Sequence, residues 1–341
     1  MTLAKKIRVL VVDDSLVFRE TLARGISSDP AIEVVGTAAD PYVARDKIIE
    51  LDPDVLTLDF EMPRMNGIEF LHRLMPQYPI PVVMLSALNN AVFEALQAGA
   101  VDFVCKPDSS SGRSLNTFIN ELIIKIKIAS TAKVGHRKND SAYRQTEPGV
   151  GGSSNIKLIA LGSSTGGTEA ISSIVKSLPD NIPGMVVVQH MPPVFTRMYA
   201  ERLNNTCALE IREAQDGDRI YPGLVLIAPG DYHMTVCRAG VNYRVNCRKG
   251  ERVNGHCPSV DVLFHSVAEH CGAHAAGIIL TGMGHDGAKG LLAMRRKGAR
   301  TIGQDERSCV VYGMPRVAYD LGAVEQQASL EKIPAALCSI L

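Results

Sequence analysis

The sequence contains no tryptophan, and aromatic residues make up only 5% of its 341 residues. Its 36 lysines and arginines are matched by 36 aspartates and glutamates, so the formal net charge is +0. Surfaces that bind nucleic acid combine a basic field with aromatic rings on which bases stack. A neutral chain with few rings supplies neither feature, and we expect no nucleic-acid partner.

The sequence also lacks a long apolar run and any Cys-x-x-Cys pair among its eight cysteines. The first apolar run follows Lys5 and Lys6 but ends at Asp13, which makes it too short for a signal peptide or a membrane span. Free thiols in a reducing compartment are the expected state of the cysteines. These features predict a cytoplasmic protein without direct membrane insertion.

Apolar runs alternate with helix-period segments in both halves of the chain, which predicts an α/β fold with mainly parallel sheets. Five such runs in the first half indicate a doubly wound sheet. Between about residues 128 and 155 the periodicity disappears, and glycine, serine and basic residues dominate. We therefore predict domains at residues 1–127 and 156–341, joined by a flexible linker at 128–155.

Polar residues directly follow predicted strands in the first half: Asp13, Asp14, Asp59, Ser86 and Lys106. Ligands bind at the carboxyl ends of parallel strands, so these side chains are expected at one site. Three carboxylates repel one another without a cation, and their hard oxygens suit Mg²⁺. One aspartate could then accept a phosphoryl group. The alternative is that each aspartate only caps the helix that follows it. This is a reasonable interpretation for any single aspartate, but it does not account for polar residues at all of these strand ends.

Four motifs carry a family resemblance: Val11-Val12-Asp13-Asp14-Ser15, Leu58-Asp59-x-x-Met62-Pro63-x-Met65-x-Gly67, Ser86-Ala87 and Asp102-Phe103-x-x-Lys106-Pro107. They resemble the response-regulator receiver domain over about residues 5–126. The resemblance implies a flavodoxin-like fold in which a histidine kinase phosphorylates Asp59. It implies that Mg²⁺ is held by Asp14, Asp59 and the backbone carbonyl of Glu61, with assistance from Asp13. It also implies a switch made of Ser86, Phe103 and Lys106, and a cis peptide bond between Lys106 and Pro107.

An apolar run in the second half ends in Gly162-Ser163-Ser164-Thr165-Gly166, and a helical pattern begins at Thr165. Gly162-x-Ser164-x-Gly166 fits a nucleophile elbow, in which a serine stands at a strand end beside unpaired N–H groups. The stretch equally fits an anion site at a helix N-terminus, or glycines that only permit close packing. On this stretch alone the three interpretations remain open.

His190 and Asp286 also follow apolar strands, so a parallel sheet would gather them with Ser164 at one edge. Histidine is the usual general base at neutral pH, which suits His190 to that role, and Asp286 would orient its imidazole. Backbone N–H groups near Thr165 and Met283 could bind the developing oxyanion. Each residue has a purely structural interpretation, but together they favour a hydrolase. The acid follows the histidine, opposite to the α/β-hydrolase order, so we predict a different fold.

Other histidines and cysteines are possible zinc ligands: His265, His270, His274, Cys257 and Cys271. A separation of five places His265 and His270 poorly on one helix face, so no metal is expected in this half. His256 and His285 flank motifs, and we expect them to be exposed loop residues rather than substrate contacts.

The second half carries further motifs, among them Gly162-Ser163-Ser164-Thr165-Gly166-Gly167, Gln189-His190-Met191-Pro192, Pro258-Ser259-Val260-Asp261 and Leu280-Thr281-Gly282-Met283-Gly284-x-Asp286-Gly287. They resemble the catalytic domain of the chemotaxis-specific protein-glutamate methylesterases, from residue 156 to about 335. The resemblance implies that Ser164 is the nucleophile, His190 the general base and Asp286 the orienting acid. It implies hydrolysis of glutamate methyl esters, and deamidation of glutamines, on methyl-accepting chemotaxis receptors.

The two halves together predict an esterase that a chemotaxis histidine kinase switches on through Asp59. An alternative of another class is a non-catalytic, phosphorylation-dependent binding module in which Ser164 and its glycines bind an anion. A transcriptional regulator is disfavoured, because the second half shows strand-rich α/β order instead of a helix-turn-helix with a basic face.

Overall fold

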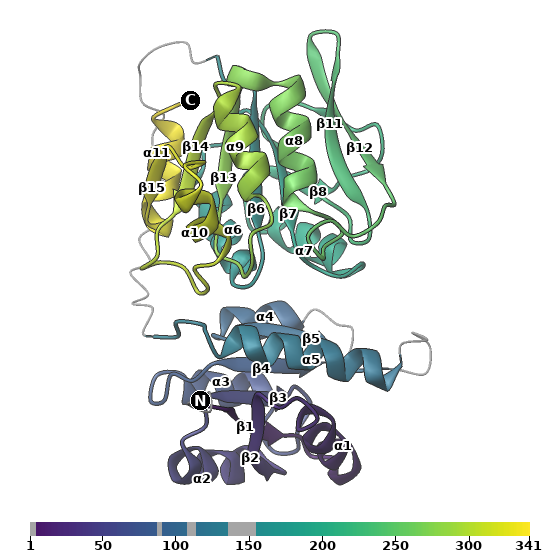
Figure 1. The fold of residues 1–341 in the computed structure, drawn as a ribbon, viewed down its shortest axis with the longest axis vertical. Helices are drawn as coiled ribbons and strands as arrows, with labels where there is room; N and C mark the ends of the chain where they lie inside the picture. The colour runs from purple at the N-terminus through teal and green to yellow at the C-terminus, as the bar shows by residue number, and fades with distance from the viewer. Residues whose placement is uncertain (1–4, 87–90, 108–113, 136–154) are drawn as a thin grey trace. The chain divides into compact units, whose positions relative to one another are not determined.

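The computed structural model describes residues 5–86, 91–107, 114–135 and 155–341 (Figure 1). The chain divides into two compact units, Met1–Asn139 and Asp140–Leu341. Both units have mainly parallel sheets, as the alternation of apolar runs and helical segments predicts. Among the helices of the described residues, none has the length and apolar character that a bilayer crossing needs.

The first unit alternates strands and helices along the chain. Its elements are β1 (Ile7–Val12), α1 (Leu16–Ile26), β2 (Ile32–Ala38), α2 (Pro41–Leu51), β3 (Val55–Asp59), α3 (Gly67–Leu74), β4 (Val82–Ser86), α4 (Ala91–Gln97), β5 (Asp102–Cys105) and α5 (Leu115–Ala129). The strand order is β2-β1-β3-β4-β5, with parallel pairing throughout. This is the doubly wound order that places ligands at the carboxyl ends of β1 and β3.

Local sequence sets where these helices begin. Ser15, Asp40, Asn66 and Ser114 each stand before a helix and accept a hydrogen bond from a backbone N–H of its first turn. Helix α5 continues to Ala129, past the domain end predicted at residue 127. The predicted linker at 128–155 otherwise lies mostly outside the described residues.

The second unit is built around a seven-stranded parallel sheet with the order β15-β14-β13-β6-β7-β10-β8. Its strands are β6 (Leu158–Ser163), β7 (Gly184–Gln189), β8 (Glu210–Glu213), β10 (Leu224–Ile227), β13 (Ala275–Ile279), β14 (Arg300–Gln304) and β15 (Gln326–Ala328). A smaller antiparallel sheet contains β9 (Arg219–Ile220), β11 (His233–Ala239) and β12 (Asn242–Arg248). Every residue of β6, β7 and β13 is buried, which fits their continuous apolar runs.

Helices cover this sheet: α6 (Gly167–Ser177), α7 (Phe195–Asn204), α8 (Val260–His270), α9 (Ala288–Arg296), α10 (Met314–Asp320) and α11 (Ile333–Cys338), with short 3₁₀ turns η1 (Gly272–His274) and η2 (Leu330–Lys332). Helices α8 and α9 lie side by side on one face (Figure 1). Their apolar residues, including Leu263, Phe264 and Leu291, pack in one core with β6, β7 and β10.

Two sequence expectations need correction. Helix α6 begins at Gly167 instead of Thr165, because Gly166 has φ +77, a left-handed conformation that interrupts a right-handed helix. Within the described residues, the cis peptide bond is Cys257–Pro258, and the bond expected to be cis, Lys106–Pro107, is not cis.

Candidate active site and phosphoacceptor site

Ser164 leaves the end of β6 at the edge where β13 also ends. Its backbone N–H donates to the carbonyl of Thr281, 3.0 Å away, and its side chain is half-buried. A Cβ atom on Gly282 would lie 2.6 Å from the Cβ of Ser164, so only glycine fits beside the serine. The backbone and Cβ of Ser164 are therefore held against the segment that follows β13.

The glycines of the serine motif have distinct roles. A Cβ on Gly162 would lie 2.1 Å from Cγ1 of Val260, so this glycine permits close approach of α8 to β6. Gly166 has a positive φ, and a Cβ there would lie 2.7 Å from Val310 atoms, so this glycine permits the turn that leads from Ser164 into α6. Close packing is therefore a sufficient reason for a glycine at position 162. It gives no reason for a serine at position 164.

His190 and Asp286 form a pair across the sheet edge. Nε2 of His190 lies 2.8 Å from Oδ2 of Asp286, and the two side chains are 6% and 2% exposed. Nδ1 of His190 is buried, and in the described part of the chain it has no hydrogen-bond partner. An unpaired buried nitrogen is costly, and this one is an acceptor left over once Nε2–H donates to the carboxylate.

Asp286 receives hydrogen bonds from several donors besides His190: Asn254 Nδ2 (2.7 Å), Ser259 Oγ (2.8 Å), Val260 N (2.7 Å) and Asp261 N (3.2 Å). Two of these are backbone N–H groups at the N-terminus of α8, whose dipole favours a negative charge. Burial by itself raises the pKa of Asp286, but the bonds from His190, Asn254 and Ser259 outweigh burial and hold the pKa well below its usual range. The acid is therefore ionised throughout the neutral range.

Gln189 ties the ends of β6 and β7 together. Its Oε1 accepts from Ser163 Oγ at 2.6 Å, and its Nε2 donates to the carbonyl of Ser164 at 2.9 Å. The backbone N–H of His190 also donates to the carbonyl of Ser163, 3.1 Å away. Gln189 was not among the predicted site residues, although a glutamine at the end of an otherwise apolar strand is a signal for such a role.

The structure places Ser164 and His190 on adjacent strand ends but does not join their side chains. No hydrogen bond connects Ser164 Oγ to His190 among the residues that are described. Such contacts are often long in unliganded enzymes and tighten when substrate binds. With Nε2 committed to Asp286, Nδ1 is the nitrogen available to the serine.

The predicted oxyanion donors follow two adjacent strands: Thr165 comes directly after Ser164 at the end of β6, and Met283 lies in the loop after β13. The backbone N–H of Met283 has no hydrogen-bond partner within the described ranges, while the neighbouring Gly282 N–H donates to the carbonyl of Val311. Thr165 is buried, and its carbonyl accepts from Thr281 Oγ1 at 3.0 Å. Met283 thus offers an N–H group at the same edge, and the role of Thr165 stays a prediction.

In the first unit, Asp13, Asp14 and Asp59 lie at the ends of β1 and β3 with ligand atoms within 4.8 Å of one another. They are the one group of this kind that is found among the described residues. Asp13 and Asp59 are buried, while Asp14 is exposed. Lys106 Nζ contacts both buried acids, at 2.9 Å from Asp13 and 2.7 Å from Asp59.

The electrostatics of this cluster suit a cation and a phosphoryl group. Burial raises the pKa of Asp59 to about 6, the Asp13 charge adds to this, and Lys106 and a backbone hydrogen bond from Glu61 oppose it. Three carboxylates with one ammonium leave net negative charge, which a hard divalent cation would neutralise. The donor set therefore fits Mg²⁺.

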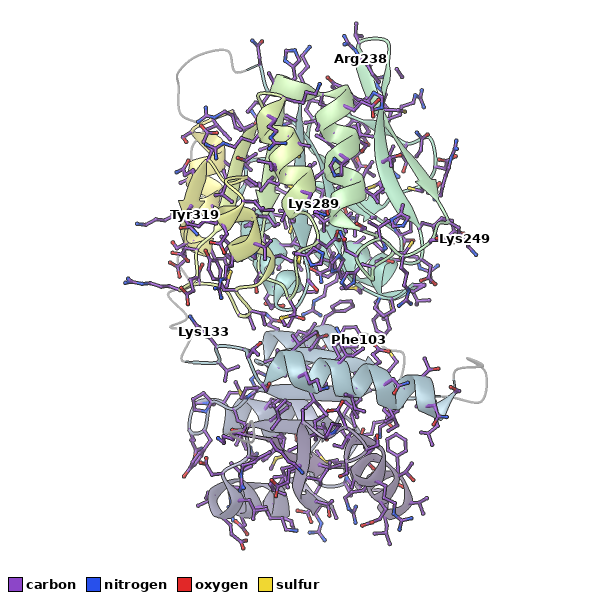
Figure 2. The ribbon with its side chains drawn as sticks, viewed as in Figure 1. Phe103, Lys133, Arg238, Lys249, Lys289 and Tyr319 are labelled. Atoms are coloured by element: carbon purple, nitrogen blue, oxygen red, sulfur yellow. The ribbon has the colours of Figure 1, made fainter. Side chains whose placement is uncertain are left out.

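The predicted switch residues lie on neighbouring strands. Ser86 ends β4 and is 2% exposed, and its carbonyl accepts from the backbone N–H of Lys106 at 2.9 Å. Phe103 on β5, labelled in Figure 2, is 7% exposed. Lys106 also lies over the ring of Phe18, with Nζ 4.8 Å from the ring centroid. The site thus contacts an aromatic residue of α1 that the sequence analysis did not identify.

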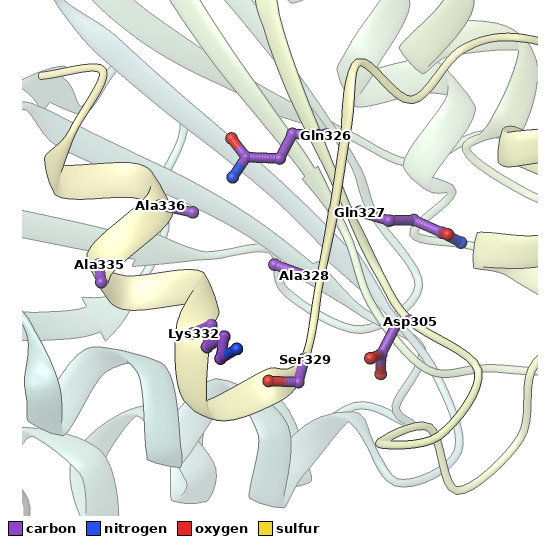
Figure 3. A pocket seen from close by; sticks show the side chains of 8 residues that line it. All are labelled: Asp305, Gln326, Gln327, Ala328, Ser329, Lys332, Ala335 and Ala336. Atoms are coloured by element: carbon purple, nitrogen blue, oxygen red, sulfur yellow. The ribbon is translucent and has the colours of Figure 1, made fainter.

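A hollow of about 540 Å³ lies between β15 and α11 (Figure 3). The residues lining it are Asp305, Gln326, Gln327, Ala328, Ser329, Lys332, Ala335 and Ala336. None of Ser164, His190 and Asp286 lines this hollow, and it contains no histidine that could act as a base. The candidate active site is therefore identified by the side chains of Ser164, His190 and Asp286, and it lies outside this hollow.

Comparisons with known proteins agree with this geometry. The CheB methylesterase family model matches residues 159–337, and the response regulator receiver domain model matches residues 9–113. The chain is 62% identical over 337 residues to "Protein-glutamate methylesterase/protein-glutamine glutaminase 2" of Syntrophomonas wolfei, covering 99% of this chain and 98% of that protein. The chain belongs to the CheB methylesterase family.

A second member of the family, the protein-glutamate methylesterase/protein-glutamine glutaminase of Syntrophotalea carbinolica, is 55% identical over 346 residues, covering 99% of this chain and 98% of that protein. The crystal structure of the Thermotoga maritima CheB methylesterase catalytic domain is 37% identical with a TM-score of 0.53, and the match covers 55% of this chain and 99% of that chain. The resemblance stated from the motifs is confirmed for both halves, and so is the fold class.

Proposed function

We propose that this chain hydrolyses methyl esters of glutamate side chains, and deamidates glutamines, on methyl-accepting chemotaxis receptors. The observation that carries the proposal is the His190–Asp286 pair, 2.8 Å apart, at the edge where Ser164 leaves β6. The names of the relatives, protein-glutamate methylesterase and protein-glutamine glutaminase, supply the substrate. Anion binding by Ser164 and its glycines would not require an ionised Asp286 hydrogen-bonded to His190.

In the proposed reaction, Ser164 Oγ attacks the ester carbonyl carbon while its proton passes to Nδ1 of His190. The developing imidazolium is stabilised by Asp286, whose depressed pKa keeps its charge in place. The negative charge on the carbonyl oxygen is taken up by the Met283 N–H, with Thr165 as the second predicted donor.

The tetrahedral intermediate then collapses. The carbon–oxygen bond to the methoxy group breaks, and methoxide leaves as methanol with the proton held by His190. His190 next removes a proton from water, which attacks the acyl-serine and releases the glutamate carboxylate and free Ser164. A glutamine substrate follows the same course, with ammonia as the leaving group. No cofactor is needed for either step.

In the first unit, Asp13, Asp14 and Asp59 would hold Mg²⁺ together with the Glu61 carbonyl. The cation would neutralise charge on the phosphoryl group that a chemotaxis histidine kinase donates to Asp59. Lys106 stands 2.7 Å from Asp59 and would pair with the phosphoryl oxygens, with Ser86 as a further partner. We propose that the unphosphorylated first unit restrains ester hydrolysis and that phosphorylation relieves the restraint.

The test is methanol release from methylated receptor membranes. Ser164→Ala should abolish release while Asp59 still becomes phosphorylated, and Asp59→Asn should keep the low basal rate without a response to phosphodonor. Hydrolysis retained by Ser164→Ala would refute the assignment of the nucleophile. A wild-type rate that ignores phosphodonor would refute the regulation alone.

A further inference from the structure

A tight turn between β12 and α8 reaches the His190–Asp286 pair. Val253 and His256 exchange two backbone hydrogen bonds of 3.0 Å, with Asn254 and Gly255 between them. Asn254 has φ +53 and Gly255 has φ +84. An Asn-Gly pair with two positive φ angles is typical of a type I′ turn, whose geometry is well defined. The side chains at positions 254 and 256 therefore project from a fixed backbone.

Asn254 connects this turn to the acid. Its Nδ2 donates to Oδ1 of Asp286 at 2.7 Å and to Oδ2 of Asp261 at 2.8 Å. Asp261 is itself anchored, because its Oδ1 accepts from the backbone N–H of Gly290 at 2.7 Å. The turn is thus bound to Asp286 and, through Asp261, to the start of α9.

His256 connects the same turn to the base, and it is half-buried instead of the exposed loop residue that the sequence led us to expect. Its ring lies on the ring of His190 with centroids 3.6 Å apart and planes inclined by 8°. A ring held only by one hydrogen bond, from Nε2 to Asp286, can still tilt about that bond. A flat partner on its face opposes tilting, since the tilt would open the contact or cause a clash.

We propose that His256 is a positioning residue, whose flat ring keeps the plane of His190 fixed, so that Nδ1 holds one orientation for taking the proton of Ser164. This inference rests on the proposed ester hydrolysis. His256 acts here by shape, and the reaction uses neither of its nitrogens. The direction of Nδ1 matters because a misaligned base loses a large part of the rate that orientation supplies.

Two substitutions in the full-length protein separate shape from proton chemistry. His256→Phe keeps a flat ring without nitrogens, and His256→Gln keeps a polar side chain without a ring. Methanol release from methylated receptor membranes, with a small-molecule phosphodonor, gives kcat and KM. We expect kcat of the Phe variant to stay within about threefold of wild type, and kcat of the Gln variant to fall on the order of tenfold or more with KM little changed.

Val253→Ala is the matched control, because it alters the same turn at an exposed side chain and leaves the ring stack in place. The proton resonance of the His190–Asp286 hydrogen bond gives a readout besides activity. It should persist in the Phe variant and broaden in the Gln variant. Thermal unfolding of each variant identifies any loss of fold.

Three results would overturn the inference. A Gln variant as active as wild type would show that the ring is not needed. A Phe variant as impaired as the Gln variant would show that the nitrogens of His256 matter. A Val253→Ala variant with the same fall in kcat would assign the effect to the turn. A wild-type protein without methanol release would instead refute the proposed hydrolysis, and the His190–Asp286 resonance would still test the positioning.

Discussion

His190 binds Asp286 through Nε2 and keeps Nδ1 buried and without a hydrogen-bond partner within the described residues. The carboxylate therefore selects the tautomer in which Nε2 carries the proton and Nδ1 can accept one. The α8 N-terminus adds two backbone donors to the same carboxylate, at Val260 and Asp261. A charge held by a helix end and a neutral, oriented imidazole are what general-base activation of a serine requires.

Replacing Asp286 should remove the preference of His190 for the tautomer that is protonated at Nε2. Asp286→Asn presents an amide whose NH₂ group can donate to Nε2, which favours the tautomer protonated at Nδ1. We expect kcat for ester hydrolysis to fall on the order of 10³–10⁴-fold, with KM much less affected. Steady-state methanol release measures both constants. Asp305→Asn, at an aspartate outside the pair, should leave both unchanged, and equal losses in the two variants would contradict the role of Asp286.

Gly162→Ala should destabilise the second unit. The added Cβ would lie 2.1 Å from Cγ1 of Val260, a buried residue at the start of α8. Overpacking of this kind costs about 1–3 kcal/mol of unfolding free energy. Because the backbone N–H of Val260 also donates to Asp286, we expect lower kcat as well.

Chemical denaturation followed by circular dichroism checks this change in stability. Gly135→Ala is the control, since in the described part of the chain, chain neighbours aside, no atom lies within 4 Å of the Cβ position there. Adding Val260→Ala should recover part of the loss by removing the clashing methyl groups. An unfolding free energy equal to that of the wild type would show that α8 and β6 can separate without cost.

Asp59 should make the first unit less stable at neutral pH than at mildly acidic pH when divalent cations are absent. Burial raises its pKa to about 6, above the value of the unfolded chain, so the folded state binds the proton more tightly. Stability from this group is therefore full below about pH 4 and is lost as the pH rises through about 6. The difference is at most about 3 kcal/mol.

Denaturation of the wild type and Asp59→Asn across this pH range tests that sign. The Asn variant should be the more stable protein at pH 7, and the gap should close toward pH 4. Asp46→Asn serves as a control, because Asp46 is an exposed aspartate on α2. A gap that widens on acidification would mean that Lys106 outweighs burial at Asp59.

Removal of divalent cations should affect phosphorylation of Asp59 but not ester hydrolysis. Asp13, Asp14 and Asp59 are the acidic cluster that would hold Mg²⁺, and the proposed hydrolysis uses only protein groups. We expect chelation to abolish phosphorylation of Asp59 by a small-molecule phosphodonor and to leave unphosphorylated ester hydrolysis within about twofold of its original rate. Phosphate incorporation and methanol release measured on the same sample give both values. A parallel fall in basal hydrolysis would contradict the assignment.

Much of the fold followed from local sequence. Buried parallel strands are continuous apolar runs, and residues such as Asp13, Asp59 and His190 stand where those runs stop, so their common edge could be predicted. The start of α6 was predicted too early, because Gly166 adopts a left-handed conformation that the periodicity does not reveal. The cis bond at Cys257–Pro258 was likewise not predicted.

The sequence by itself determined the family, the two-unit order and the residue types of both candidate sites, since each is written in contiguous motifs. Only the tertiary structure decided which nitrogen of His190 meets Asp286, and that Asn254 and His256 bind this pair. Those contacts join residues that are far apart in the chain, and their geometry depends on how α8 and its preceding turn pack against the strand ends. Periodicity reports which side chains are buried, but it carries no information on which atoms of two distant side chains face each other.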